Sequence, residues 1–278
     1  MVTPIPFPKF GLPVSRARRL LYCTLGTVSP YYKGKAALQG CPPPLAQAVR
    51  RSLLTRDGRL LFLKNPKAAC STVVQLIHFH ETGRFADVSR LHRTPDLRQG
   101  HPHAEAHIAA LDDPSCVRFT AVREPASRTV SAFMMFFSGA GADVFSEEGR
   151  DKKAAKREAG MWALGYDPRG DVNRNFDVFL EYLTRCFETG PEHVNIHWKP
   201  QTLSIALGHI RYSHIGRVES LKQDLQTVSE MIGYSMFDDR RELPSVNRAR
   251  GRSGFEPTTE QRRKIRQLYA QDYEAFGY

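Results

Sequence analysis

The first third of the chain contains two apolar segments with a polar interruption between them. Residues 60–63 are all apolar, as expected of a short strand that is buried on both faces. Asn65 and Pro66 interrupt this run, because such a pair favours a turn. Apolar residues then recur over 72–82, where Gly83 can end a helix. The pattern predicts a buried strand, a tight loop and a helix.

The same order of elements recurs further along the chain. Residues 116–122 are rich in β-branched and aromatic side chains, which favour a strand. Pro125 suits the first turn of a helix, and the apolar residues that follow continue to Phe137. A strand that leads directly into a helix is therefore predicted here as well.

Further apolar patterns extend this alternation to the end of the chain. Residues 176–183 have the spacing of an amphipathic core helix, 209–216 have the pattern of a late strand, and 258–278 that of a terminal helix. Residues 1–50 are proline-rich and basic, and they form either an ordered arm or a partly disordered one. We expect this arm to precede a single α/β domain over 51–278.

The loop after the first strand has the composition of an anion-binding site. Ala68 and Ala69 are small enough to let the backbone approach a ligand. Ser71 and Thr72 add hydroxyl donors, and Lys67 adds a full positive charge. The first amides of the next helix and the positive end of its dipole also favour an anion. These features predict a bound phosphate or a phosphate-like group.

This loop is not a Walker A loop. That motif requires the pattern G-x-x-x-x-G-K-[ST], and no glycine lies between Gly58 and Gly83. The loop alone does not identify a nucleotide site, since any buried strand that enters a helix has similar features.

The second junction of a strand and a helix adds another cationic site. Arg123 follows the strand directly, so its guanidinium belongs to the strand end. Arg128 and Ser131 are three residues apart and share one face of the next helix. A guanidinium at a strand end and a hydroxyl in the following helix predict a second anion site.

The composition gives the chain a strong positive charge. The formal net charge is +11 and the isoelectric point is about 9.6. Such a balance favours polyanionic partners, namely nucleotides, acidic sugars, nucleic acids or anionic lipid surfaces. The sequence has no nucleic-acid-binding signature, and none of its five cysteines forms a C-x-x-C pair of the kind found in zinc sites. We therefore expect neither a nucleic-acid partner nor a metal.

Together, the two junctions resemble the nucleotide-binding motifs of sulfotransferases. Residues 66–72 (Pro-Lys-Ala-Ala-Cys-Ser-Thr) are similar to the loop that binds the 5′-phosphosulfate of 3′-phosphoadenosine 5′-phosphosulfate (PAPS), and 122–133 resemble the 3′-phosphate motif. The resemblance is greatest to the membrane-type carbohydrate sulfotransferases and their bacterial relatives. It implies a P-loop-like three-layer α/β fold, in which helices flank a central, mainly parallel sheet.

The resemblance also implies a reaction and roles for particular residues. A sulfuryl group is expected to pass from PAPS to a hydroxyl or amine acceptor by in-line displacement, which leaves 3′-phosphoadenosine 5′-phosphate (PAP). Lys67 is expected to neutralise the leaving phosphate, while Arg123 and Ser131 hold the 3′-phosphate. The residues expected to bind the 5′-phosphosulfate are Lys67, Ala68, Ala69, Cys70, Ser71 and Thr72.

Histidines between the two motifs are candidates for the base that takes the acceptor proton. The segment 100–108 holds three of the ten histidines. The resemblance favours His101 and His103 as catalytic residues, ahead of His107. Glu105 is the alternative base. The residues alone favour a solvated or capping role over catalysis for each histidine.

Two further segments are candidates for substrate contacts. Residues 243–254 form a strongly basic loop, and a late basic loop commonly covers the 3′-phosphate in sulfotransferases. Arg250 is therefore a candidate cofactor contact, together with Arg248 and Arg252. We expect most of residues 143–175 to form a solvated helix face, and a lid that contacts the acceptor is the alternative.

The expected acceptor is an anionic carbohydrate or a glycolipid, because the chain is strongly basic. No apolar run in the sequence reaches the length of a membrane span. We therefore expect a cytoplasmic enzyme of the bacterial type, with peripheral contact to a membrane through basic residues as an open alternative. A trimmed form of an anchored relative would instead belong to the Golgi lumen.

Other functions compete with sulfuryl transfer. The missing Walker glycines argue against a nucleotide-dependent kinase. A non-enzymatic polyanion-binding module explains the charge but not two ordered phosphate motifs. A degenerate sulfotransferase would bind nucleotide without turnover, and the intact Lys67, Arg123 and Ser131 argue against it.

Overall fold

The computed structural model of the protein describes residues 14–87, 90–137, 159–236 and 254–278. The chain forms two compact units. We call the first the sheet unit, which comprises residues 13–123 and 201–246. The second, the helical unit, comprises residues 1–12, 124–200 and 247–278.

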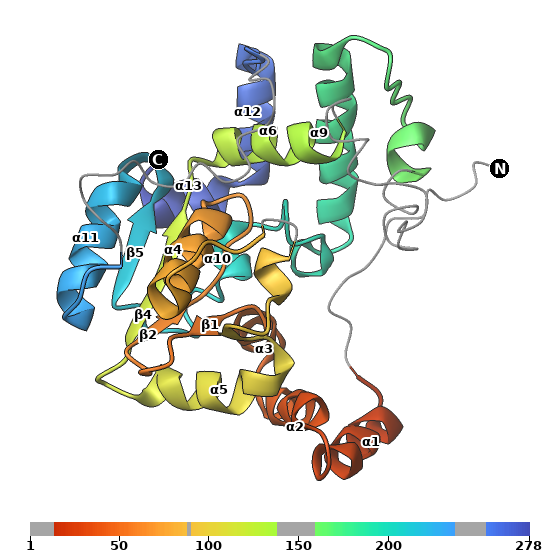
Figure 1. The fold of residues 1–278 in the computed structure, drawn as a ribbon. Helices are drawn as coiled ribbons and strands as arrows, with labels where there is room; N and C mark the ends of the chain where they lie inside the picture. Colours follow the sequence, from red (N-terminus) through yellow and green to blue (C-terminus); the bar gives the residue numbers. More distant parts are fainter. Residues whose placement is uncertain (1–13, 88–89, 138–158, 237–253) are drawn as a thin grey trace. The chain divides into compact units, whose positions relative to one another are not determined.

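A five-stranded sheet in the order β3-β1-β2-β4-β5 organises the sheet unit (Figure 1). Its strands are β1 (Leu53–Leu54), β2 (Leu60–Phe62), β3 (Arg98–Gln99), β4 (Val117–Val122) and β5 (His214–Arg217). The pairs β2–β4 and β4–β5 are parallel, whereas β1 is antiparallel to both β2 and β3. Every strand except β1 therefore runs in the same direction, which confirms the predicted mainly parallel sheet.

Helices cover both faces of this sheet. The helices of the sheet unit are α1 (Arg16–Gly26), α2 (Pro30–Ala37), η1 (Leu38–Gly40), α3 (Pro43–Val49), α4 (Cys70–Thr82), η2 (Leu91–Arg93), η3 (His101–His103), α5 (Ala104–Asp112), α10 (Gln201–Ser204), η6 (Val218–Ser220) and α11 (Leu221–Ile232). Phe62 of β2 and Phe119 of β4 pack against α4 and α11 on one face. Leu61 of β2 points to the other face, against α3 and α5. The three layers agree with the expected fold class.

The predicted helix and strand boundaries agree closely with the structure in most places. Helix α4 begins at Cys70, two residues before the predicted start, and ends where predicted, with Gly83 in the left-handed conformation at φ 72°. The late strand is shorter than predicted, since β5 begins at His214 rather than at residue 209. Residues 209–211 instead run through a loop at the start of β4, where the Arg211 carbonyl accepts from Arg118.

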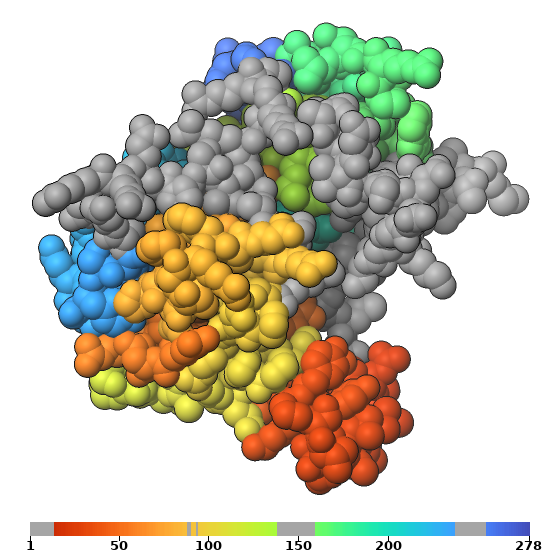
Figure 2. All heavy atoms as spheres, viewed as in Figure 1, coloured from red at the N-terminus to blue at the C-terminus, as the bar shows by residue number. Residues whose placement is uncertain are grey.

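The described part of the N-terminal arm is ordered. Helices α1 and α2 pack against each other, and α2 packs against η3. No residue of α1 is buried. In Figure 2 the two helices appear in red, with their atoms exposed at the surface. Gly34 of α2 lies so close to η3 that a Cβ atom there would be 1.6 Å from the carbonyl oxygen of His101. A side chain at this position would therefore separate α2 from η3.

The helical unit has a core of aromatic side chains. Its helices include α6 (Pro125–Phe136), α9 (Val172–Glu188), η5 (Pro191–His193), α12 (Thr259–Leu268) and α13 (Ala270–Phe276). Phe176, Phe179 and Leu183 follow one face of α9 and are fully buried. They pack with Phe133 of α6 and with Trp198. The predicted helix at 176–183 is confirmed, and it extends further at both ends.

Glu124 fixes the start of α6, the helix that carries Ser131. Its carboxylate accepts hydrogen bonds from the amides of Ala126 at 3.0 Å and Ser127 at 2.6 Å. The Tyr273 hydroxyl donates to it at 2.8 Å. Burial acts to raise the pKa of Glu124, but these hydrogen bonds outweigh it and lower the pKa. The side chain is thus an ionised N-cap.

We expect Glu124→Ala to lower the free energy of unfolding by about 1 kcal/mol, the usual cost of losing an N-cap. Urea denaturation at pH 7 measures this change. Glu181→Ala is the control, because Glu181 makes only an exposed ion pair with Arg185 and its loss costs a few tenths of a kcal/mol. Equal losses in the two variants would contradict the capping role.

Candidate functional site

The two predicted anion sites begin at neighbouring strand ends. Phe62 of β2 is paired with Phe119 of β4, and Val122 of β4 with Arg217 of β5. Since these strands are parallel, their carboxyl ends share one edge of the sheet, the edge at which open α/β sheets bind ligands. The loop that contains Lys67 follows β2, and Arg123 follows β4 directly.

The backbone of the first loop is strained. Lys67 and Ala69 have φ angles of 68° and 55°, in the left-handed region. This conformation costs a non-glycine residue about 1–2 kcal/mol, and such strain concentrates at functional sites. Alternation of left-handed and ordinary residues turns successive amides toward one side of the chain, which forms an anion-binding concavity. Ala68 lies between the two strained residues and is completely buried.

The loop leads into the N-terminus of α4. Ala69 is the N-cap residue and provides no side-chain acceptor for the first amides of the helix. No acidic residue lies in the first turn, where Cys70, Ser71 and Thr72 are partly exposed. The positive end of a 13-residue helix is thus presented at the loop, as an anion requires.

Lys64 and His92 lie beside this loop, and sequence reasoning missed both. The Lys64 ammonium donates to Gln99 Oε1 at 2.6 Å, and burial lowers the pKa of Lys64 to about 8. His92 Nε2 is 3.0 Å from the Ser71 hydroxyl. Loss of solvent around the ring, and then the charge of Lys64, lower the pKa of His92 to about 4. The imidazole of His92 is therefore neutral near pH 7.

A buried amide network joins the two strand ends. Gln201 Oε1 accepts from the Arg123 amide and from Asn65 Nδ2, both at 3.0 Å, and Gln201 Nε2 donates to the Arg123 carbonyl at 2.8 Å. Asn65 Nδ2 also donates to the Ala121 carbonyl at 3.0 Å. Both amide side chains are fully buried. Sequence reasoning missed Gln201, because its partners are remote in the chain.

The three histidines of segment 100–108 have different surroundings. His101 packs edge-on against Tyr31 of α2, with ring centroids 4.9 Å apart, and burial lowers its pKa to about 4. Burial, followed by the charge of Arg98, also lowers the pKa of His103, which is partly exposed. Both imidazoles are therefore neutral near pH 7 and can accept a proton.

His107 has a structural role. It is fully buried, its Nε2 donates to the Arg98 carbonyl at 2.9 Å, and its Nδ1 lies 2.8 Å from the Ser52 hydroxyl. Both ring nitrogens are thus engaged by the protein. Glu105, the alternative base, forms an exposed ion pair with Lys33 at 2.7 Å.

Ser131 belongs to the helical unit, on the partly buried side of α6. Arg128 of the same helix is buried and donates to the carbonyls of Lys199 and Ile196 at 2.9 and 3.2 Å. Its guanidinium therefore secures the fold. Ser131 as a ligand of the 3′-phosphate stays a prediction.

Two predicted segments are described only in part or not at all. Arg250, Arg248 and Arg252 lie outside the described residues. In the described part of 143–175, Trp162 is 53% exposed and packs edge-on against Tyr166. The role of segment 143–175 stays a prediction, because residues 143–158 lie outside the described residues.

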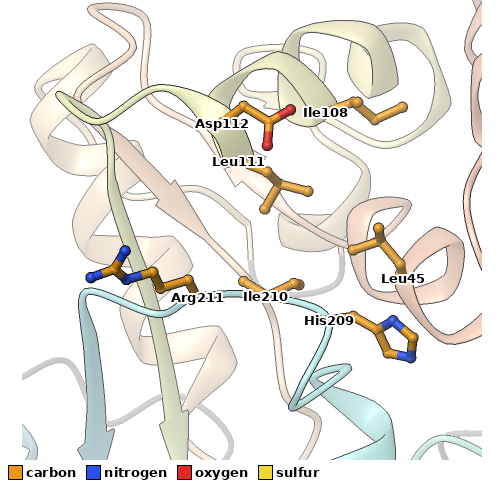
Figure 3. A pocket seen from close by; sticks show the side chains of 7 residues that line it. All are labelled: Leu45, Ile108, Leu111, Asp112, His209, Ile210 and Arg211. Atoms are coloured by element: carbon orange, nitrogen blue, oxygen red, sulfur yellow. The ribbon is translucent and has the colours of Figure 1, made fainter.

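A small cavity of about 240 Å³ lies in the sheet unit between α3, α5 and residues 209–211 (Figure 3). Its lining residues are Leu45, Ile108, Leu111, Asp112, His209, Ile210 and Arg211. They come from α3, α5 and the loop at the start of β4, which is the amino end of the parallel strands. The cavity is therefore separate from the edge that carries Lys67 and Arg123.

Within the described ranges, no group of three or more histidine, cysteine, aspartate or glutamate side chains could hold a metal ion. In the same part of the chain, no helix combines the length and the apolar character needed to cross a bilayer.

Comparison with known proteins identifies the family of the chain. A model of the sulfotransferase family matches residues 50–278. The chain belongs to this family. Its curated relatives include carbohydrate sulfotransferase 11 of Mus musculus and of Rattus norvegicus, each 24% identical over 202 residues, which cover 68% of this chain and 54% of the relative. The chain thus spans about half the length of these relatives. No solved structure matches it.

We expect two substitutions of Ala69 in the strained loop to have different effects on stability. Valine is β-branched and resists a φ of 55°, so Ala69→Val should lower the free energy of unfolding by about 1–2 kcal/mol relative to Ala69→Gly. Urea denaturation of both variants measures the difference. Equal stability of the two would show that the left-handed backbone carries no strain.

The buried imidazole of His107 predicts a pH dependence of stability. Burial lowers its pKa to about 4 in the folded protein, against about 6.5 in the unfolded chain. The unfolded state therefore binds more protons between these pH values, so stability falls as the pH drops from about 6.5 to 4. The wild type should exceed His107→Gln in free energy of unfolding at pH 7, and this difference should become smaller as the pH drops from about 6.5 to 4. A constant difference from pH 7 to pH 4.5 would contradict this account.

Proposed function

We propose that the protein transfers a sulfuryl group from PAPS to a hydroxyl or amine group of a carbohydrate acceptor. The observation that carries the proposal is the parallel pairing of β2 with β4, which brings the Lys67 loop and Arg123 to adjacent strand ends. Family membership and the relatives named carbohydrate sulfotransferases support it.

The donor would bind along the carboxyl edge of the sheet. Its 5′-phosphosulfate fits the strained loop, because the amides of residues 68–72 and the uncapped start of α4 favour an anion. Lys67 would neutralise the phosphate that leaves, and Ser71 and Thr72 would donate from their hydroxyls. Arg123 would hold the 3′-phosphate, with Ser131 and Arg250 as further proposed contacts.

The reaction would be a direct displacement at sulfur. The acceptor oxygen or nitrogen forms a bond to sulfur while the bond from sulfur to the bridging phosphate oxygen breaks, and PAP leaves with both electrons of that bond. His103 would take the acceptor proton. We place His103 ahead of His101, because the ring of His101 packs against Tyr31. A neutral imidazole is ready to accept the proton near pH 7.

The acceptor would be an anionic carbohydrate or a glycolipid. The net charge of +11 favours an acidic substrate by long-range attraction.

Binding of PAP tests the donor site. Without added metal, PAP should raise the unfolding temperature of the wild type more than AMP or ATP does, because only PAP carries the 3′-phosphate. At a concentration of about 100 times its dissociation constant, a ligand stabilises the folded state by about 2.7 kcal/mol. Differential scanning fluorimetry measures these shifts.

Arg123→Ala should remove most of the preference for PAP over AMP. The matched control is Arg211→Ala, because Arg211 is an exposed arginine of the same unit that lines the cavity at the amino end of the strands. This control should leave the preference intact. Equal stabilisation of the wild type by PAP and AMP would reject the proposed function, and stronger stabilisation by ATP with magnesium would favour a kinase.

A further inference from the structure

We infer that Gln201 is a positioning residue that holds the 3′-phosphate site in register with the 5′-phosphate loop. The inference rests on the proposed function and concerns a residue outside both nucleotide motifs. Gln201 lies in the short helix α10, 78 positions from Arg123 and 136 from Asn65 along the chain. Its side chain is completely buried.

The Gln201 side chain pairs with the backbone of Arg123 as a neighbouring strand would. Its Oε1 accepts from the Arg123 amide at 3.0 Å, and its Nε2 donates to the Arg123 carbonyl at 2.8 Å. The pairing of β4 with its neighbours ends one residue earlier, at Val122. The amide of Gln201 thus continues the hydrogen bonding of the sheet by one residue, and that residue carries the proposed 3′-phosphate contact.

The same side chain reaches the start of the first loop. Gln201 Oε1 also accepts from Asn65 Nδ2, whose second hydrogen bond goes to the Ala121 carbonyl. Asn65 lies two residues before Lys67, at the point where the backbone leaves β2 for the strained turn. One buried amide group therefore holds the starting points of both anion sites.

This arrangement has a consequence for ligand selection. A nucleoside with phosphates on its 3′ and 5′ positions has a fixed distance between them, so it gains from both sites only if their separation is also fixed. AMP has no 3′-phosphate and does not depend on that separation. Loss of the Gln201 hydrogen bonds should weaken binding of PAP much more than binding of AMP.

The test compares Gln201→Met with Gln75→Met. Gln75 is a matched control, because it is also buried and also makes two hydrogen bonds to the backbone of one residue, Ala86. Methionine has nearly the same shape as glutamine but does not donate hydrogen bonds. Both variants should lose similar stability in urea denaturation.

Isothermal titration calorimetry would give the affinities of each variant for PAP and AMP. In Gln201→Met, the ratio of the two affinities should fall by about tenfold, the equivalent of one or two hydrogen bonds. In Gln75→Met the ratio should equal that of the wild type. A wild-type ratio in Gln201→Met, at reduced stability, would leave Gln201 a purely structural role and overturn the inference. A wild type without any preference for PAP would instead reject the proposed function.

Gln201→Glu provides a second variant if Gln201→Met does not fold. A protonated carboxyl can still donate to the Arg123 carbonyl and accept from the Arg123 amide, whereas an ionised one cannot donate. Relative to the wild type at the same pH, the PAP to AMP ratio of Gln201→Glu should recover as the pH is lowered. A ratio that does not change with pH, relative to the wild type, would also overturn the inference.

Discussion

The parallel pairing of β2 with β4 brings the Lys67 loop and Arg123 to the same edge of the sheet. Because Phe62 is paired with Phe119, the loop after β2 and the residue after β4 leave the sheet side by side. The buried side chains of Asn65 and Gln201 extend this pairing past the last backbone hydrogen bonds of the strands. A shift of one strand against the other would move both anion sites and expose buried amides, which is energetically costly.

The loop adopts left-handed backbone conformations without the glycines that a Walker loop uses. Left-handed conformations at Lys67 and Ala69 are unfavourable for residues with a Cβ, so the surrounding structure must impose them. Helix α4 supplies this constraint, because Val73, Val74 and Ile77 are fully buried in the core under the sheet. The stability of this core compensates for the strained backbone of the loop.

The basic groups near this edge differ in charge at neutral pH, because burial lowers the pKa of some of them whereas arginine keeps its charge. Burial lowers the pKa of Lys64 to about 8 and that of His101 to about 4, and it lowers the pKa of His103 as well. The histidines are therefore neutral at the pH at which a base has to accept a proton. Arginines remain charged at any physiological pH, so Arg123 can supply the electrostatic attraction for phosphate.

Much of the fold and part of the site could be predicted from the sequence by itself. Apolar spacing located β2, α4, β4 and α9, because burial on one or two faces leaves a local periodic pattern. The composition of residues 67–72 predicts an anion site, and the resemblance to a family predicts its ligand. These features depend on residues that are close in the chain.

Only the tertiary structure decided which distant residues meet. Gln201 reaches Asn65 across 136 positions, and His92 reaches Ser71 across 21, through contacts that no local pattern encodes. It also separated His107, whose ring nitrogens are both bound by the protein, from His103, because burial depends on how α5 packs on the sheet. The sequence thus determined the helices and strands and the types of side chain in each loop, whereas packing determined the partners of each side chain.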